Sequence, residues 1–503
     1  MGNEKTYNIS YFHIAAGLLW GAVIFHSVFR IFSLNRYAAS WDAVDFALGV
    51  IQFDLLQMQP HFPGYPYFIL GGMLLNPVLE NPVLALEIWN IILAASSFYP
   101  IYRLAAGRLP EGKRLIAAVL VYTLSYPAVL SVQPLSDSAA LSVLWWFLWS
   151  LEFSGKSNRS FHLLLPAFIF SILMGIRLSY LPFGIGLVLL WRHNWKNGQN
   201  HHKMKRLVYH VAAALVFQLV WVGGLIFNEG SVRAFLGMAA GFTSGHFSDW
   251  GGAATATGDA LPDRAWQLIV NILWSGIAGE SLYMLIGVIL LVQVSFWSFF
   301  KEKRSGQDSV IPYLHAILFG SYFIWALFAQ NVDKPRHAAP LAILTAFHLF
   351  IVLLKGRTRF PVLAAALFLS LQLWTGSHIL ERLAGEVPAT YQLASYLDEV
   401  EEPFIVYTWE EKRVMDYTGV RYPYKRTLTY DYFEMEVSRL DGRRIFLTGH
   451  VAEGFRQQGA DVDSHLKKVE TFNSSSLVLP VYHKITLYEW QSSSENMSGG
   501  VTQ

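Results

Sequence analysis

The chain has no cysteine among its 503 residues. Disulfide bonds, thiolate catalysis and cysteine-ligated metal sites are therefore excluded. The sequence also lacks a P-loop and a dinucleotide-binding fingerprint. We expect no nucleic-acid partner.

Charged residues are scarce as well. They make up 15% of the chain, against about 25% in an ordinary soluble domain. Apolar residues make up 53%, and the mean hydropathy is positive. This is the composition of a membrane protein, in which the loops that hold Lys and Arg matter more than the net charge of +2.

Apolar runs recur along most of the chain. The runs that match the ~30 Å hydrocarbon core of a bilayer lie near 11–33, 83–102, 115–132, 207–227, 266–299, 310–330, 337–354 and 360–380, and shorter ones lie at 138–153, 162–176 and 181–192. The first run is too long, and too poorly followed by a cleavage site, for a signal peptide. The fold class predicted is an all-α multi-span membrane domain with about 11 transmembrane helices.

The basic residues predict the orientation. With the N-terminus in the cytoplasm, every short loop rich in Lys and Arg falls on the inner side, as the positive-inside rule requires. The acidic loops fall on the opposite side, and the C-terminus lies outside. The segment 62–79 contains several Pro and Gly residues, and counting it as a span would invert this pattern. We therefore predict that it is a re-entrant or surface helix on the outer face of the cell membrane.

Three domains are predicted. Residues 1–385 form the transmembrane domain, 386–490 a small α/β extracytoplasmic domain, and 491–503 a disordered tail. Within the transmembrane domain, the Gly-, Ala- and Thr-rich stretch 228–265 is expected to be a mobile outer loop.

The prediction of an α/β domain depends on short helix-like and strand-like sequence patterns that alternate after residue 385. We expect a helix over 391–402, strands at PFIVYTW and RRIFLTG, a second helix at VDSHLKKVETF and a strand at KITLYEW.

The stretch WDAVDFALGVIQFDLLQMQPHFPGYPYFILGG follows the first apolar run. Its carboxylates must lie at a watery surface, because a charge at hydrocarbon depth costs about 2.5–3.5 kcal/mol or more. Asp42 and Asp45 would share one face of a helix, where helix capping is the alternative role. The following QPHFPGYP breaks any helix and favours a loop that shapes a site.

This stretch resembles the first outer loop of the GT-C glycosyltransferases, in particular family-39-like and O-mannosyltransferase-like members. The resemblance covers about thirty residues, carried by WDAVDFAL and QPHFPGYPYFILGGMLL, and departs at Phe62, where the family tends to have proline. It implies a multi-span enzyme that moves a sugar, with mannose as one candidate, from a polyprenyl-phosphate carrier to an acceptor at the outer face.

Glycosyl transfer needs a carboxylate that takes a proton from the acceptor hydroxyl. By resemblance Asp42 occupies the family's catalytic acidic position, and Asp45 is the second candidate. In the same region, His61 is expected to hydrogen-bond a substrate or a carboxylate, because no second His or Glu stands at metal-ligand spacing. Tyr65 is a further substrate-binding candidate.

The leaving lipid phosphate needs cations around it. Arg177 is one candidate, with a snorkelling interfacial Arg as the alternative. Lys334, Arg336 and His337 resemble the basic motif that GT-C enzymes present to the donor phosphate, with an ordinary charged loop as the alternative.

Asp137 precedes an apolar run and could be a helix N-cap. If it faces Asp42, the two carboxylates could hold a divalent cation such as Mg or Mn.

The predicted function is therefore an inverting membrane glycosyltransferase of the cell envelope that acts on a protein, lipid or glycan acceptor. A flippase or polymer-handling protein for lipid-linked sugars is the alternative, and would need charges along a path at mid-membrane. A non-catalytic membrane scaffold is a third interpretation, which leaves the Asp/His/Pro loop unexplained.

Overall fold

The computed structural model describes residues 2–157, 159–197, 202–301, 311, 313–356, 358–440 and 442–491. It divides into two compact units. The first comprises Met1–Arg36 and Phe46–Ala384, and the second comprises Tyr37–Asp45 and Gly385–Gln503. The expected tail, except for residue 491, lies outside the described residues.

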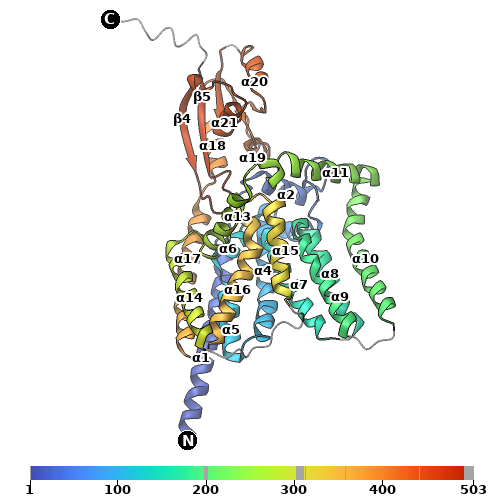
Figure 1. The fold of residues 1–503 in the computed structure, drawn as a ribbon. Coiled ribbons are helices and arrows are strands. Elements are labelled where there is room, and N and C mark those ends of the chain that lie inside the picture. Colours follow the sequence, from blue (N-terminus) through green and yellow to red (C-terminus); the bar gives the residue numbers. More distant parts are fainter. Residues whose placement is uncertain are drawn as a thin grey trace. The chain divides into compact units, whose positions relative to one another are not determined.

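The first unit is helical (Figure 1). Its helices are α1 Gly2–Phe32, most of α2 Trp41–Ile51, α3 Pro66–Leu79, α4 Pro82–Ala106, α5 Glu111–Tyr122, α6 Ser125–Ser131, α7 Asp137–Gly155, α8 Ser160–Ile176, η1 Leu178–Gly184, α9 Ile185–Asn197, α10 Lys203–Glu229, α11 Val232–Ser248, α12 Ala254–Thr257, α13 Leu261–Val270, η2 Asn271–Ile277, α14 Leu282–Lys301, α15 Leu314–Ala329, η3 Pro335–Ala338, α16 Ala339–Lys355 and α17 Phe360–Gly385.

Five helices in the described part of the chain are long and apolar enough to cross a membrane, and seven if each of two bent pairs counts as one span. The bent pairs are α5 with α6 and the α13–η2 segment with α14. Three shorter apolar helices, α3, α15 and most of α8, accompany them. The multi-span helical class is confirmed, and the number of eleven crossings stays a prediction.

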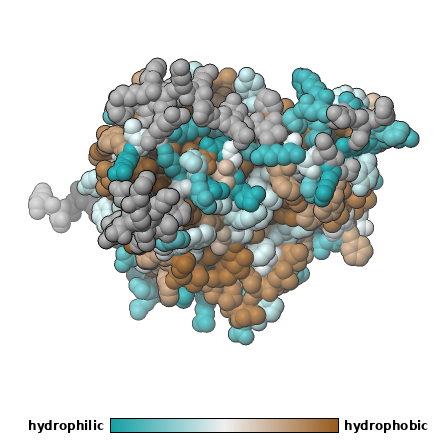
Figure 2. All heavy atoms as spheres, turned by 90° about the horizontal axis from the view of Figure 1, so that it is seen from below, coloured by the Kyte–Doolittle hydropathy of each residue, from teal (hydrophilic) through white to brown (hydrophobic). Residues whose placement is uncertain are grey.

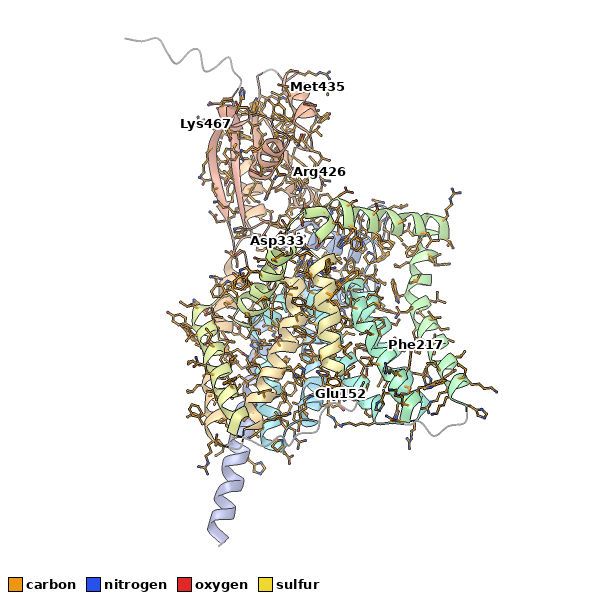
Figure 3. All side chains as sticks on the ribbon, in the orientation of Figure 1. Glu152, Phe217, Asp333, Arg426, Met435 and Lys467 are labelled. Carbon is orange, nitrogen blue, oxygen red and sulfur yellow. The ribbon has the colours of Figure 1, made fainter. Side chains whose placement is uncertain are left out.

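Two contacts mark one end of the first unit. At this end Arg108 forms an ion pair with Glu152, and Lys113 donates a hydrogen bond to the carbonyl of Gly356. The α4–α5 and α16–α17 connections therefore share this end with the last turn of α7. Figure 3 labels Glu152 at this end and Asp333 at the other. Viewed from below, hydrophobic residues form a patch in the lower part of the picture, and hydrophilic residues lie across its middle and at its upper right (Figure 2).

Helix α3 covers the segment predicted to be re-entrant or superficial. Its 14 residues span about 21 Å at 1.5 Å per residue, which is shorter than the ~30 Å hydrocarbon core. The pair Gly71 and Gly72 permits close packing on α4, because a Cβ at Gly71 would lie 2.2 Å from the Trp89 ring.

The prediction that 228–265 is a loop is wrong, and its mobility stays a prediction. Most of this segment is helical, as α11, α12 and the start of α13. The side chain of Ser231 caps α11 by accepting a hydrogen bond from the Ala234 N–H, 3.2 Å. Phe235 and Phe242 are spaced to lie on one face, and this apolar face outweighs the composition rich in Gly and Ala.

The second unit contains a five-stranded sheet in the order β2-β1-β3-β5-β4. Its strands are β1 Phe404–Thr408, β2 Tyr424–Arg426, β3 Arg444–Thr448, β4 Leu466–Asn473 and β5 Lys484–Trp490. Strand β1 pairs in parallel with β2 and β3, whereas β5 pairs antiparallel with β3 and β4. The helical elements are α18 Ala389–Asp398, α19 Glu411–Thr418, α20 Tyr430–Val437, α21 Gly449–Gln457 and η4 Asp463–His465.

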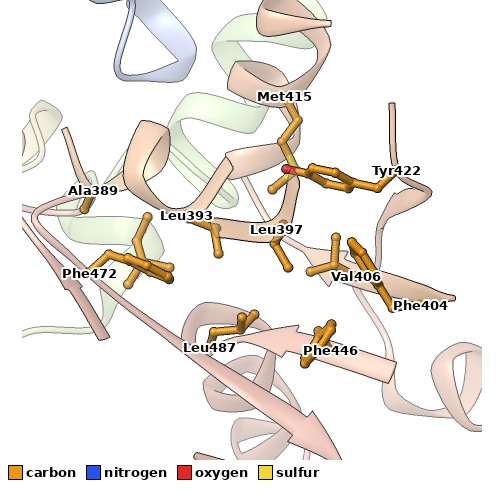
Figure 4. Close-up of a cluster of buried hydrophobic side chains, with 11 residues drawn as sticks. Ala389, Leu393, Leu397, Phe404, Val406, Met415, Tyr422, Phe446, Phe472 and Leu487 are labelled. Atoms are coloured by element: carbon orange, nitrogen blue, oxygen red, sulfur yellow. The ribbon is translucent and has the colours of Figure 1, made fainter. Parts of the chain in front are cut away.

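One hydrophobic core of this unit lies between α18 and the sheet (Figure 4). Leu393 and Leu397 of α18 pack there with Val406 of β1, Phe446 of β3 and Leu487 of β5. The predicted α/β character, the helix near 391–402 and the strands at PFIVYTW, RRIFLTG and KITLYEW are confirmed.

The helix predicted at VDSHLKKVETF is wrong. Only Asp463–His465 is helical, as a short 3₁₀ turn, and the residues from Leu466 onward form β4. Phe472 pairs with Ile485 of β5 and packs against the Tyr396 ring with centroids 5.5 Å apart. Pairing with β5 therefore overrides a local pattern that also suited a helix.

Candidate functional site

The turn His61–Pro66 is built on aromatic contacts within the first unit. The His61 Nε2 and the Tyr65 hydroxyl are hydrogen-bonded at 3.0 Å, and the His61 ring stacks on Phe46 with centroids 5.5 Å apart. Gly64 has φ 88, a conformation that favours glycine. The structure thus brings the predicted His61 and Tyr65 into one contact.

Helix α11 covers this turn. The Phe62 ring lies 5.6 Å from Phe235 and 5.4 Å from Phe242 between centroids, and Phe242 also stacks on His61 at 6.2 Å. Phe62 is the position at which the sequence departs from the family's proline. Its ring contacts α11, which accounts for an aromatic residue there.

Asp137 and Arg177 form an ion pair in the first unit. Asp137 begins α7, and Arg177 follows the last residue of α8. The guanidinium lies 3.1 Å from Asp137 Oδ1 and 3.3 Å from Oδ2, and it donates a further hydrogen bond to the Ser136 hydroxyl at 2.9 Å. Asp137 is buried. Arg177 is therefore held inside the unit, rather than extending from the surface as a snorkelling residue would.

The predicted basic motif lies beside this pair. The charges of Arg177, Lys334 and Arg336 all act on the His337 ring, and the Tyr322 hydroxyl donates a hydrogen bond to the His337 carbonyl at 3.1 Å. Arg177 also acts electrostatically on the Tyr65 phenol. We name Tyr65, Asp137, Arg177, Lys334, Arg336 and His337 the cationic cluster. Its members come from four places in the sequence.

The two leading catalytic candidates belong to the second unit, together with the C-terminal residues. Asp45 is 0% exposed, and its Oδ1 accepts a hydrogen bond from Arg413 Nε at 2.7 Å. Asp42 is half-buried. Asp42 is thus the more exposed of the two residues, and Asp45 forms a buried ion pair with Arg413.

Tyr482 links the start of α2 to the C-terminal residues. Its hydroxyl accepts a hydrogen bond from the Trp41 N–H at 3.4 Å and donates one to the carboxylate of Glu410. Burial, followed by the charges of Glu410 and Asp42, raises the pKa of Tyr482 well above its ordinary value. The phenol therefore remains a hydrogen-bond donor and holds the backbone next to Asp42.

The Trp41 ring also contacts two guanidinium groups, at 5.7 Å from Arg413 and 5.2 Å from Arg426. Such cation–π contacts contribute about 0.5–2 kcal/mol each, depending on exposure. These contacts help to hold Trp41, the residue before Asp42, in place.

Comparison with known proteins gives similarity at the level of the fold. No protein-family model matches the chain, and no curated protein sequence matches it. Among solved structures, it is similar to ArnT from Cupriavidus metallidurans, both bound to undecaprenyl phosphate and in the apo state. Each likeness has a TM-score of 0.53 and 10% identity, over 95% of this chain and 98% of that chain.

The chain has a GT-C fold. A weaker likeness, with a TM-score of 0.45 and 11% identity over 86% of this chain and 69% of that chain, relates it to an Archaeoglobus fulgidus oligosaccharyltransferase tethered with an acceptor peptide. With its apolar helices, the GT-C fold makes the chain a multi-pass membrane protein.

Several residues with structural contacts were missed in the sequence. Arg413, Glu410 and Tyr482 lie far along the chain from Trp41, so no local spacing could relate them. Arg264, placed by the sequence in a loop, is buried and donates hydrogen bonds to the carbonyls of Gly252, Leu327 and Gln330. Nothing in the DALPDRAW stretch around Arg264 indicated that this arginine would be buried and bonded to backbone carbonyls.

The divalent cation stays a prediction. Both carboxylate oxygens of Asp137 lie within hydrogen-bond distance of Arg177, an arrangement that does not favour a metal at this carboxylate. Among the described residues, no group of three or more His, Asp or Glu side chains is arranged to hold a metal ion.

Proposed function

We propose that this protein is an integral-membrane inverting glycosyltransferase that moves a sugar from a polyprenyl-phosphate carrier to an acceptor at the outer membrane face. The observation that carries the proposal is the GT-C fold, shared over 95% of the chain with an ArnT structure bound to undecaprenyl phosphate. The cationic cluster supports it, because a lipid-phosphate leaving group needs positive charge around it.

In the proposed reaction, Asp42 takes the proton from the acceptor hydroxyl as its oxygen attacks the anomeric carbon. The new C–O bond forms on the face of the anomeric carbon opposite the phosphate. The bond between the anomeric carbon and the phosphate oxygen breaks, and the lipid phosphate leaves with the bonding electron pair. Arg336 and Lys334, with Arg177 beside them, stabilise the departing phosphate. A phosphate needs no proton to leave, so one carboxylate base suffices.

Glu410 and Tyr482 act as positioning residues in this proposal. They hold the Trp41 backbone, and Asp42 is the next residue. This gives the C-terminal domain a part in the reaction, because its side chains determine where the base lies.

The flippase alternative differs in its chemistry. It requires transport of an intact lipid-linked sugar, without cleavage of the sugar–phosphate bond.

The purified protein can be incubated with radiolabelled polyprenyl-phosphate sugars, mannose first, and with protein, lipid and glycan acceptors. We expect label to pass to an acceptor. Movement of uncleaved donor across vesicles, with no label transferred, would support the flippase and contradict the proposal.

A further inference from the structure

One of the bent helix pairs in the first unit breaks at a carboxylate. The α13–η2 segment and α14 are bent by 102° across residues 278–281. Glu280 lies in this break with φ 58, and Gly279 before it has φ 59. Left-handed backbone is uncommon for a residue other than glycine and clusters at functional sites. The segment just before the break, η2, is a π-helix, a form that also occurs frequently at such sites.

The carboxylate of Glu280 is half-buried and largely unused within the first unit. Its Oε1 accepts a hydrogen bond from the Ser275 hydroxyl at 3.1 Å. Among the described residues, this is the one hydrogen bond of the carboxylate, and no cation forms an ion pair with it. A carboxylate offers about four acceptor positions, so most of this capacity is open to a ligand.

The break packs on the start of α6. A Cβ at Gly279 would lie 3.2 Å from the Ser125 side chain, and α6 packs against η2. Tyr126, the next residue of α6, is 0% exposed, and its hydroxyl has no hydrogen-bond partner among the described residues. Buried hydroxyls are normally paired, so Tyr126 carries an unsatisfied hydrogen-bonding group beside the break.

Tyr126 links Glu280 to the cationic cluster. The charges of Asp137, Arg336 and Glu280 all act on the Tyr126 phenol. The elements also touch, because α6 packs on α7, which begins at Asp137, and η2 packs on η3, which contains Arg336. A carboxylate repels a phosphate, whereas it accepts hydrogen bonds from hydroxyl groups. Glu280 therefore suits the neutral part of a donor whose phosphate the cations hold.

We propose that Glu280 and Tyr126 bind hydroxyl groups of the donor sugar. The inference rests on the proposed function, which assigns the lipid phosphate to Arg336 and Lys334. In a polyprenyl-phosphate sugar, the sugar is bonded directly to the phosphate, so polar groups that border the phosphate site contact the sugar ring. Glu280 accepts hydrogen bonds from sugar hydroxyls, and the Tyr126 phenol donates or accepts one. The two side chains thus distinguish sugars by the positions of their hydroxyl groups.

Equilibrium binding to the purified full chain tests this assignment with four probes: undecaprenyl phosphate without a sugar, and undecaprenyl-phosphate mannose, glucose and galactose. Glu280→Gln keeps the size of the side chain and removes its charge. It should weaken binding of the tightest sugar-bearing probe about tenfold, through loss of a charge-assisted hydrogen bond. Binding of the bare carrier should stay equal or become tighter, because a repulsive charge is removed. Tyr126→Phe should weaken the same sugar-bearing probe about threefold and leave the bare carrier unchanged.

The controls match the tested residues in side chain, and one also matches in backbone. Glu80→Gln changes an exposed carboxylate that also has a positive φ, 52. Tyr283→Phe changes an exposed tyrosine of α14. Neither control should alter binding of any probe.

The outcomes separate this inference from the proposed function. Equal weakening of sugar-bearing and bare probes in Glu280→Gln and Tyr126→Phe would show a general effect on the site and overturn the sugar assignment. Unchanged binding of every probe in both variants would overturn it as well. Failure of the natural chain to bind any of the four probes would contradict the proposed function, and this inference with it.

Stability separates binding residues from structural ones. Without a probe, Tyr126→Phe should melt at the same temperature as the natural chain or higher, because it removes an unpaired buried hydroxyl. Glu280→Gly should also melt no lower, since glycine adopts φ 58 without strain. Lower melting temperatures in both variants, with undiminished binding of the sugar-bearing probe, would make the two residues structural and overturn the proposal.

Discussion

Asp42 and Asp45 show how neighbouring residues of one type differ in environment. Both were recognised from the sequence as surface carboxylates on one helical face. In the structure Asp45 is buried and accepts a hydrogen bond from Arg413, 368 positions later in the chain, whereas Asp42 is half-buried. Residue type and local motif were enough to name both as candidates, whereas the difference in their burial could be seen only in the folded second unit, and their roles stay a prediction.

The first prediction at this scale concerns the donor phosphate. Arg336→Gln should weaken binding of a polyprenyl-phosphate sugar by about 1.5–3 kcal/mol, the contribution of a charge-assisted hydrogen bond. Equilibrium binding to the purified protein measures the effect, with the exposed Arg382→Gln as the control. Unchanged affinity in Arg336→Gln would reject the assignment.

A second residue-level prediction concerns pH. The hydrogen bond from His450 Nδ1 to Glu411, 2.7 Å, raises the pKa of His450 above its ordinary value near 6.5. The stabilisation is therefore fully present below about pH 6.5 and is lost as the pH rises through the raised pKa. Melting curves of the natural chain should show this loss. His450→Gln and Glu411→Gln should both reduce it, and an undiminished pH dependence in both would contradict the role of this pair.

At the scale of elements, long apolar helices and buried strands were predictable because their patterns are local. The failures at α11 and β4 have a common cause. Helix α11 is fixed by contacts of Phe235 and Phe242 with Phe62, and β4 is fixed by pairing with β5. Both partners are distant in the sequence, so composition alone gave a loop in one case and a helix in the other.

The packing of α11 on the turn predicts a change in local dynamics. Phe62→Ala removes the ring that contacts Phe235 and Phe242, so amide hydrogen exchange in Val232–Ser248 should become faster. Hydrogen exchange with mass spectrometry on the purified protein measures it. The exposed Phe227→Ala provides a matched control that should leave exchange in α11 unchanged. Equal exchange in Phe62→Ala and the natural chain would show that this contact does not hold α11.

At the scale of the whole molecule, the chain forms two units that do not follow the sequence order. Tyr37–Asp45 belongs with the C-terminal residues, although the sequence placed it in the transmembrane domain. Asp42 is thus held by the unit that contains the sheet. The domain boundaries stay a prediction, and the fold gives the C-terminal unit a direct connection to the proposed base.

The proposed membrane orientation can be tested with single cysteines, because the natural chain has none. Cysteine in place of the exposed Ser464 should react with an impermeant reagent on intact cells. Cysteine in place of Asn200, which lies outside the described residues, should react only after the membrane is opened. The opposite pattern would contradict the proposed orientation.

The central claim is that Asp42 is the base of a glycosyl transfer, and turnover of Asp42→Asn tests it most directly. The substitution keeps the size of the side chain and removes its basicity, so transfer of labelled sugar should fall by roughly 10²–10⁴-fold. Donor binding and the melting temperature should stay close to those of the natural chain, and Asp45→Asn provides the comparison. Near-normal turnover in Asp42→Asn would contradict the account.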